Sequence, residues 1–431
     1  MKKIIALVLA LALTVCLCAC AEKAPKIEGP VAQHSNAYGY NSWSVHFEEN
    51  EAGENVYTYM NDKAETVEVP AADMTQMLDR VVATCGEETL DNRMLNLYYQ
   101  QTLYDFTAQY ASYLSYIMDT NVNLDEQMSM NGDMTWQETI LEAAFANFFQ
   151  VSALYQQAKK DGFAMTADSQ NFIDTLRENL DAAAVSAGFA DADEYLQVSF
   201  GPGITYDVYA KFSEMNALAV DYGNSLVEGK TFTEEELNTY FDENTDMFEQ
   251  MGIKKVDQNV IDVRHILLMV EEDAEESVWT ETEQKAQQLL DEGAKGDATE
   301  ESFAALATEK TEDPGSSGTG GLYENVYPGQ MVETFDAWCF EDGRQTGDTG
   351  IVKTPYGYHI MYFVGQGDYI HWQAAAESYL LNNTAAELRA QVTEQYEQSS
   401  EPAGVVVLEY AAPTVPSAET EEDVALNPVE G

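Results

Sequence analysis

Apolar side chains recur at three- and four-residue spacing through the first half of the chain, which is the pattern of helices with one buried face. After a short strand and turn, a long helix is predicted to begin near Leu90 and to continue to Ile117. Thr135 with Glu138 forms a capping box, so a second helix should open there and stop at Gly162. Further helices are predicted from about Ala167 to Ala187, Asp191 to Val198, Tyr206 to Leu226 and Thr233 to Asn244.

The pattern changes in the second half, where β-branched residues from Val260 to Leu268 predict a buried strand. A helix from about Thr280 to Leu290 should follow it. Helical spacing returns over 372–381 and 385–398, and a closing strand is predicted over 404–410. Because helices lie on both sides of the strand-rich segment, we expect an α+β fold in which a small antiparallel-sheet domain is inserted into a mainly helical lobe.

These changes divide the chain into six predicted segments. They are a signal peptide (1–19), a tether with some β structure (20–80), the first part of a helical lobe (81–250), the inserted domain (258–366), the second part of the lobe (367–412) and an acidic disordered tail (413–431).

The N-terminus carries Lys2 and Lys3 followed by an apolar run from Ile4 to Val15. This run is shorter than the ~20 residues a bilayer-spanning helix needs, so it predicts a secretory signal. Leu17 and Cys20 lie in a Leu-x-Ala-Cys sequence that resembles the lipobox of bacterial lipoproteins. That resemblance implies lipidation of Cys20 and a location outside the cytoplasm, anchored to the outer face of the bacterial cell membrane.

The formal net charge of −54 at pH 7 disfavours nucleic acid, whose binding requires a basic surface. Histidine, cysteine and acidic residues show no metal-ligand spacing, so we expect neither a metal nor another cofactor. Cys85 and Cys339 remain in the body of the chain. They are either two buried thiols or, less favoured because they fall in different predicted segments, a disulfide.

One ordered set of residues carries candidate chemistry. It consists of Arg264-His265-Ile266-Leu267, Asp313-Pro314-Gly315-Ser316, Gly320-Gly321, Gly329-Gln330-Met331, Phe335 and Thr354-Pro355-Tyr356-Gly357-Tyr358-His359. This set resembles the parvulin family of peptidyl-prolyl cis/trans isomerases (rotamases). With the lipobox and the flanking helices, the whole arrangement is similar to that of parvulin-containing extracytoplasmic foldases.

The resemblance implies that His265 and His359 lie on adjacent strands and that a hydrogen-bonded chain orients Thr354. It also implies that Asp313 lies beside the substrate amide, where burial should raise its pKa. For the two histidines, a role in shaping the site and one in proton transfer both remain open. Asp313 could instead simply open a turn.

By the same resemblance, Met331 and Phe335 form the floor and wall of a proline pocket. Their spacing of four would place both on one face of a helix that begins near Gly329, although both could merely fill a core. Leu322 or Tyr323 should complete the pocket. Counting back from Gly329 aligns Tyr323 with a leucine of the family.

Tyr356 could stack on client residues that flank the proline, or could only pack across strands.

Five acidic residues lie between Glu271 and Glu276, where phosphate-directed parvulins carry bases. A phosphorylated client is therefore disfavoured.

Rotation about a peptide bond crosses a barrier of ~18–20 kcal/mol but breaks no bond, so an apolar pocket suffices for non-covalent catalysis. We expect a membrane-anchored isomerase and foldase for unfolded or newly exported polypeptides that contain X-Pro. The alternative is a holdase chaperone with an inactive parvulin domain.

A hydrophobic face of the helical lobe could serve as a client cradle or as a homodimer seam. A solute-binding lipoprotein would need two α/β lobes, which the long helices do not supply.

Overall fold

The computed structural model of this chain describes residues 43–49, 55–60, 66–69, 71–119, 122, 124–130, 132, 134–271, 273–295, 298–401 and 404–409. Its contacts define two units. Unit 1 comprises the described residues up to Glu228 together with those from Asn383 onward, and unit 2 comprises Gly229–Asn382. The predicted signal peptide, Cys20 and the acidic tail lie outside the described residues.

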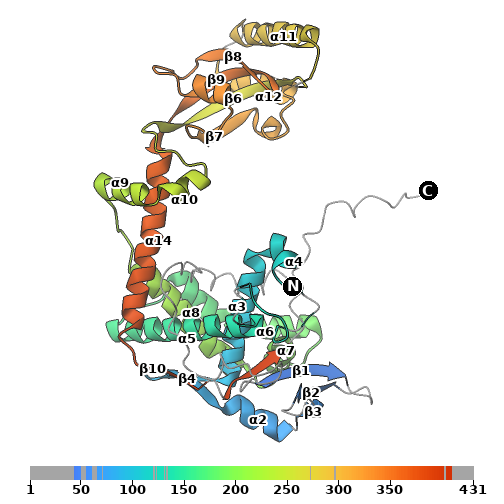
Figure 1. Cartoon of the computed structure of the whole chain (residues 1–431), viewed down its shortest axis with the longest axis vertical. Coiled ribbons are helices and arrows are strands. Elements are labelled where there is room, and N and C mark those ends of the chain that lie inside the picture. Colours follow the sequence, from blue (N-terminus) through green and yellow to red (C-terminus); the bar gives the residue numbers. More distant parts are fainter. Residues whose placement is uncertain are drawn as a thin grey trace, which may run out of the picture. The chain divides into compact units, whose positions relative to one another are not determined.

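Unit 1 is mainly helical (Figure 1). Its helices are α2 (Ala71–Asp79), α3 (Asn92–Gln109), the short η2 (Ala111–Tyr113) and α4 (Leu114–Ile117), α5 (Trp136–Asp161), α6 (Ala167–Ala187), α7 (Ala192–Phe200) and α8 (Tyr206–Ser225). The predicted capping box is present at the start of α5, and Gly162 ends that helix with a left-handed φ of +67°. Tyr98, Phe148 and Phe212 from α3, α5 and α8 meet edge to face in the core.

The first predicted helix is wrong at both ends. Glu88–Asp91 forms strand β5, which pairs antiparallel with β4 (Val81–Cys85), and the Asp91 side chain then caps α3 by accepting from the Met94 amide. Helix α3 stops at Gln109, and Tyr113 and Tyr116 beyond it are exposed. The apolar periodicity therefore continued past the end of the helix.

Two small sheets complete unit 1. One has the strand order β11-β1-β2-β3 and the other β10-β4-β5. The remaining strands are β1 (Trp43–Glu49), β2 (Asn55–Met60), β3 (Thr66–Glu68), β10 (Gln398–Ser400) and β11 (Val406–Glu409). The predicted closing strand is β11, and two buried asparagines of α3 hold it. Asn92 Oδ1 accepts from the Val406 amide at 2.9 Å, and Asn96 Oδ1 accepts from the Leu408 amide at 2.8 Å.

Helices α9 (Glu234–Glu243) and α10 (Thr245–Gln250) belong to unit 2. Phe241, Phe248 and Trp372 form the centre of their core. Trp372 comes from α14 (His371–Thr393), which is one continuous helix where two were predicted. The unit boundary falls inside this helix.

The rest of unit 2 is built on one antiparallel sheet of order β7-β6-β9-β8. Its strands are β6 (Asn259–Met269), β7 (Leu322–Val326), β8 (Thr349–Thr354) and β9 (Gly357–Ile370). Successive residues of a strand point to opposite faces. One face of the sheet, with Ile266 and Ile360, packs against α11 (Glu276–Lys295) and α12 (Glu300–Lys310), and Figure 1 shows α11 along this side. The other face, with Val263 and Phe363, packs against α13 (Glu333–Cys339).

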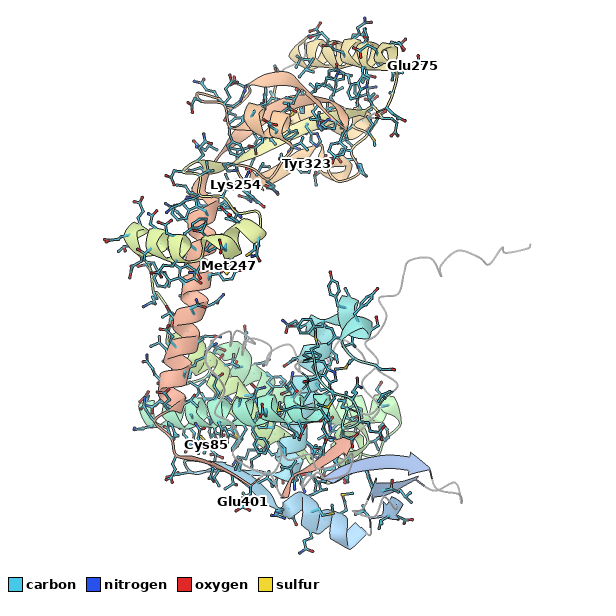
Figure 2. The ribbon with its side chains drawn as sticks, in the orientation of Figure 1. Cys85, Met247, Lys254, Glu275, Tyr323 and Glu401 are labelled. Carbon is cyan, nitrogen blue, oxygen red and sulfur yellow. The ribbon has the colours of Figure 1, made fainter. Side chains whose placement is uncertain are left out.

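Cys85 and Cys339 are both buried free thiols and belong to different units, so the disulfide alternative is wrong. Cys85 is labelled in Figure 2. Among the described residues, no helix has the length and apolar character needed to cross a membrane.

Candidate active site

His265 and His359 lie on the neighbouring strands β6 and β9, on the face of the sheet that packs against α13. His265 pairs with Met361 and His359 pairs with Leu267 in the antiparallel register, so the two imidazoles meet diagonally. Their Nδ1 atoms are 3.0 Å apart, and both side chains are buried. One ring must therefore donate to the other.

Asp313 follows α12, in a segment that hydrogen bonds hold against the C-terminal part of β6. The Glu312 amide donates to the Leu267 carbonyl at 2.9 Å, and the Leu267 amide donates to Thr311 Oγ1 at 3.1 Å. These bonds place Asp313 Oδ2 3.1 Å from His265 Nε2. The carboxylate thus faces the ring nitrogen that is not engaged by His359.

The other end of the network is Thr354, whose Oγ1 lies 2.9 Å from His359 Nε2 and accepts from the Tyr356 amide at 3.1 Å. An ionised carboxylate accepts only, so the His265 Nε2–H donates to Asp313. His265 Nδ1 must then accept from the His359 Nδ1–H, and His359 Nε2 accepts from the Thr354 hydroxyl. One set of tautomers satisfies the whole chain.

The pKa values of these groups agree with this assignment. Burial lowers the pKa of His265, with Asp313 opposing, and burial together with His265 lowers the pKa of His359 to about 3. Both rings are therefore neutral near pH 7. Burial by itself raises the pKa of Asp313, but hydrogen bonds from Ser316, Tyr323 and the Gly315 amide bring it below its ordinary value. The predicted rise in the Asp313 pKa is therefore wrong.

The two predicted pocket residues border this network. Phe335 is buried and lies edge-on to both imidazoles, with ring centroids 5.6 Å from His265 and 5.2 Å from His359. Met331 is partly buried in the same apolar cluster. The predicted helix from Gly329 is wrong, because α13 begins only at Glu333 and Met331 lies in the preceding turn.

Tyr323 and Leu322 are neighbours on β7, so their side chains point to opposite faces of the sheet. Tyr323, labelled in Figure 2, lies opposite Val263 and stacks on His265 with centroids 4.8 Å apart. Leu322 lies opposite Arg264 and so faces away from the histidines. Tyr356 is 61% exposed, outside the buried network.

Two residues of the motif have contacts that the sequence analysis did not assign. Ser316 is fully buried, its Oγ lies 3.1 Å from His265 Nε2, and it donates a very short hydrogen bond to Asp313. A serine three residues after an acid in a Pro-Gly turn is the available signal for such a bond. Gly321 adopts φ +74°, and a Cβ there would lie 2.1 Å from the His265 carbonyl oxygen. Only glycine lets the chain approach His265 this closely.

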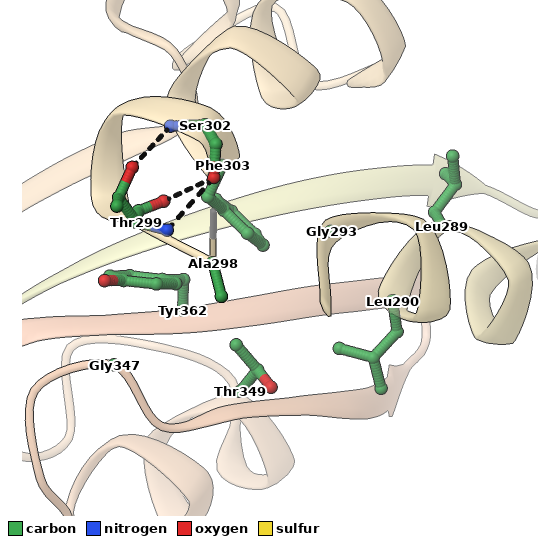
Figure 3. Close-up of a pocket in the computed structure, with 10 residues that line it drawn as sticks. All are labelled: Leu289, Leu290, Gly293, Ala298, Thr299, Ser302, Phe303, Gly347, Thr349 and Tyr362. Atoms are coloured by element: carbon green, nitrogen blue, oxygen red, sulfur yellow. Dashed lines mark hydrogen bonds between the residues drawn. The ribbon is translucent and has the colours of Figure 1, made fainter. Parts of the chain in front are cut away.

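A separate pocket of about 120 Å³ lies between α11, α12 and the β8–β9 region, with Leu290, Phe303 and Tyr362 in its lining (Figure 3). Phe303 and Tyr362 belong to the opposite face of the sheet from His265 and His359. This pocket is therefore not part of the histidine site.

Known proteins resemble this chain in the segment that holds the histidines. Residues 246–366 match the family model of the PPIC-type peptidyl-prolyl isomerase domain, so the chain carries a parvulin-type domain. The chain is similar over part of its length to PrsA foldases. Foldase protein PrsA 1 of Listeria innocua is 33% identical over 138 residues, which are 31% of this chain and 39% of that protein. Foldase protein PrsA of Caldanaerobacter subterraneus is 30% identical over 187 residues, 43% of this chain and 51% of that protein.

The match thus spans about two fifths to one half of the length of these two foldases. Among solved structures, peptidylprolyl isomerase PrsA from Bacillus anthracis is 14% identical to this chain, with a TM-score of 0.23. That comparison covers 58% of this chain and 93% of the other.

Proposed function

We propose that this chain is a peptidyl-prolyl cis/trans isomerase that acts on X-Pro bonds of unfolded or newly exported polypeptides. The observation that carries this proposal is the continuous network of Asp313, His265, His359 and Thr354 beside Phe335, inside the segment that matches the isomerase domain family.

The proposed catalysis is non-covalent. Phe335 and Met331 hold the proline ring and exclude water from the amide, which favours the twisted transition state with its less polarised carbonyl. The neutral histidines keep the pocket wall in one hydrogen-bonded arrangement and transfer no proton. Asp313 already accepts four hydrogen bonds, two of them from His265 and Tyr323, which argues against attack by its carboxylate on the substrate.

For the whole protein, we propose a foldase anchored outside the cytoplasm through lipid on Cys20, with the helical lobe holding client chains. Exposed Glu271, Asp273, Glu275 and Glu276 after β6 support a preference for clients without phosphate. Cys20→Ser should abolish incorporation of labelled palmitate and release the protein from the membrane fraction. Unchanged labelling would contradict the proposed anchor.

A protease-free assay of proline-peptide isomerisation with the purified full-length chain tests the activity. Met331→Ala should lower kcat/KM by about tenfold or more, because it removes apolar contact with the ring. Phe335→Ala should lower it further, and circular dichroism would check that this buried position still folds. Met251→Ala, at an exposed methionine that follows α10 outside the histidine site, should leave kcat/KM unchanged.

If the wild-type chain does not accelerate isomerisation, the enzymatic proposal fails. Suppression of client aggregation by that same inactive chain would then favour the holdase alternative.

A further inference from the structure

Tyr323 combines two contacts that no leucine could make together. Its ring lies parallel to the His265 imidazole within 23°, at 4.8 Å between centroids. Its hydroxyl donates to Asp313 Oδ2 at 2.8 Å. Counting residues back from Gly329 aligns this position with a leucine that the parvulin family often has. The phenol is therefore a feature of this chain.

Asp313 Oδ2 receives donors from three different parts of the fold. His265 approaches from β6, Tyr323 from β7, and Ser316 from the turn after Asp313 itself. The other oxygen, Oδ1, accepts from the Gly315 amide at 3.2 Å. Three of the four donors converge on Oδ2, the oxygen that faces His265. Asp313 is thus directed inward, toward His265.

We propose that Tyr323 is a positioning residue that holds both partners of the Asp313–His265 hydrogen bond, the carboxylate through its hydroxyl and the imidazole through its ring. The proposal deepens the proposed isomerase function and rests on it for the kinetic consequence. The His265 tautomer determines which way His359 and Thr354 donate. By holding the Asp313–His265 hydrogen bond, Tyr323 therefore acts on the whole network.

The proposal predicts a pH effect. The titratable groups that face Asp313 are His265 on β6, His359 behind it on β9, and Tyr323 on β7. The electrostatic effect of His265 lowers the Asp313 pKa a little, but most of the lowering comes from hydrogen-bond donors. Removing the Tyr323 hydroxyl takes away one of them, and the pKa of Asp313 should rise. The ordered network should then be lost at a higher pH as the solution is acidified.

Long-range ¹H–¹⁵N spectra of the histidine side chains of the full-length protein test this directly, because the chain has only five histidines. In Tyr323→Phe, which keeps the stacked ring, the acid-side step in the His265 Nε2 shift should move to higher pH. Tyr323→Leu should show the same direction of change. Tyr369→Phe, at a partly exposed tyrosine of β9, is the matched control and should leave the step where it is.

The kinetic readout should agree. The acid limb of the kcat/KM profile should shift to higher pH in Tyr323→Phe, with little change near pH 7, where Asp313 is ionised in both proteins. An unmoved His265 step in a folded Tyr323→Phe protein would overturn the proposal, as would a loss of activity that is equal at every pH. A step that moves in a protein without isomerase activity would support the positioning role and reject only the proposed function.

Discussion

The Nδ1 atoms of His265 and His359 lie 3.0 Å apart, and this contact passes the direction of donation that Asp313 sets from one ring to the other. Because Asp313 fixes the proton of His265 on Nε2, His265 can only accept at Nδ1, and His359 must donate. The Thr354 hydroxyl is then the donor that His359 Nε2 requires.

Thr354→Val keeps the side-chain shape but removes this donor. A buried hydrogen bond contributes about 0.5–1.5 kcal/mol, so kcat/KM for a proline peptide should fall by roughly three- to tenfold, and the ¹⁵N signal of His359 Nε2 should change. Thr354→Ser should restore both. Thr280→Val, which removes an exposed hydroxyl from α11, is the control. Equal activity of Thr354→Val and wild type would contradict the assigned direction of donation.

Stability should depend on pH through His359. Its pKa is about 3 in the folded protein and about 6.5 when exposed, so between these values the unfolded chain binds a proton that the folded protein does not. The free energy of unfolding should therefore decrease as the pH falls from about 6.5 toward about 3, by a few kcal/mol. Urea unfolding of unit 2 at several pH values measures this. His359→Gln should flatten the dependence, and an unchanged slope would show that other groups cause it.

Gly321→Ala should displace β7 from β6. The added Cβ would meet the His265 carbonyl oxygen at 2.1 Å in a backbone conformation with φ +74°, and neither backbone can move cheaply. We expect a loss of at least about 2 kcal/mol of unfolding free energy and a large loss of activity. Gly318→Ala is the matched control, because nothing lies within 4 Å of its Cβ position. Similar stabilities of the two variants would show that β7 can shift freely.

Asn96→Ala should loosen the last described strand of unit 1. The change leaves the Leu408 amide and the Val406 carbonyl without their buried partner, at an expected cost of about 2–3 kcal/mol. Hydrogen exchange of the Leu408 amide should accelerate accordingly. Asn179→Ala on the exposed face of α6 should stay within about 0.5 kcal/mol of wild type. Unchanged exchange in Asn96→Ala would mean that the pairing of β11 with β1 alone holds the strand.

The sequence by itself determined features that depend on neighbours along the chain. Helix starts such as Thr135 with Glu138 and Thr233 with Glu236 were predictable because capping is a contact over three residues. The parvulin-like motif was recognisable because its order and spacing survive without knowledge of the fold. The α+β class followed from where helical and strand periodicities alternate.

Only the tertiary structure decided what depends on neighbours across the fold. The apolar periodicity marked neither the end of helix α3 at Gln109 nor the continuity of α14 past residue 381. Which of Leu322 and Tyr323 faces the histidines depended on the register of β7 against β6. The sign of the Asp313 pKa shift depended in part on Tyr323, which β7 brings to the carboxylate beside the local donors Gly315 and Ser316, because burial and hydrogen bonding act on a carboxylate in opposite directions.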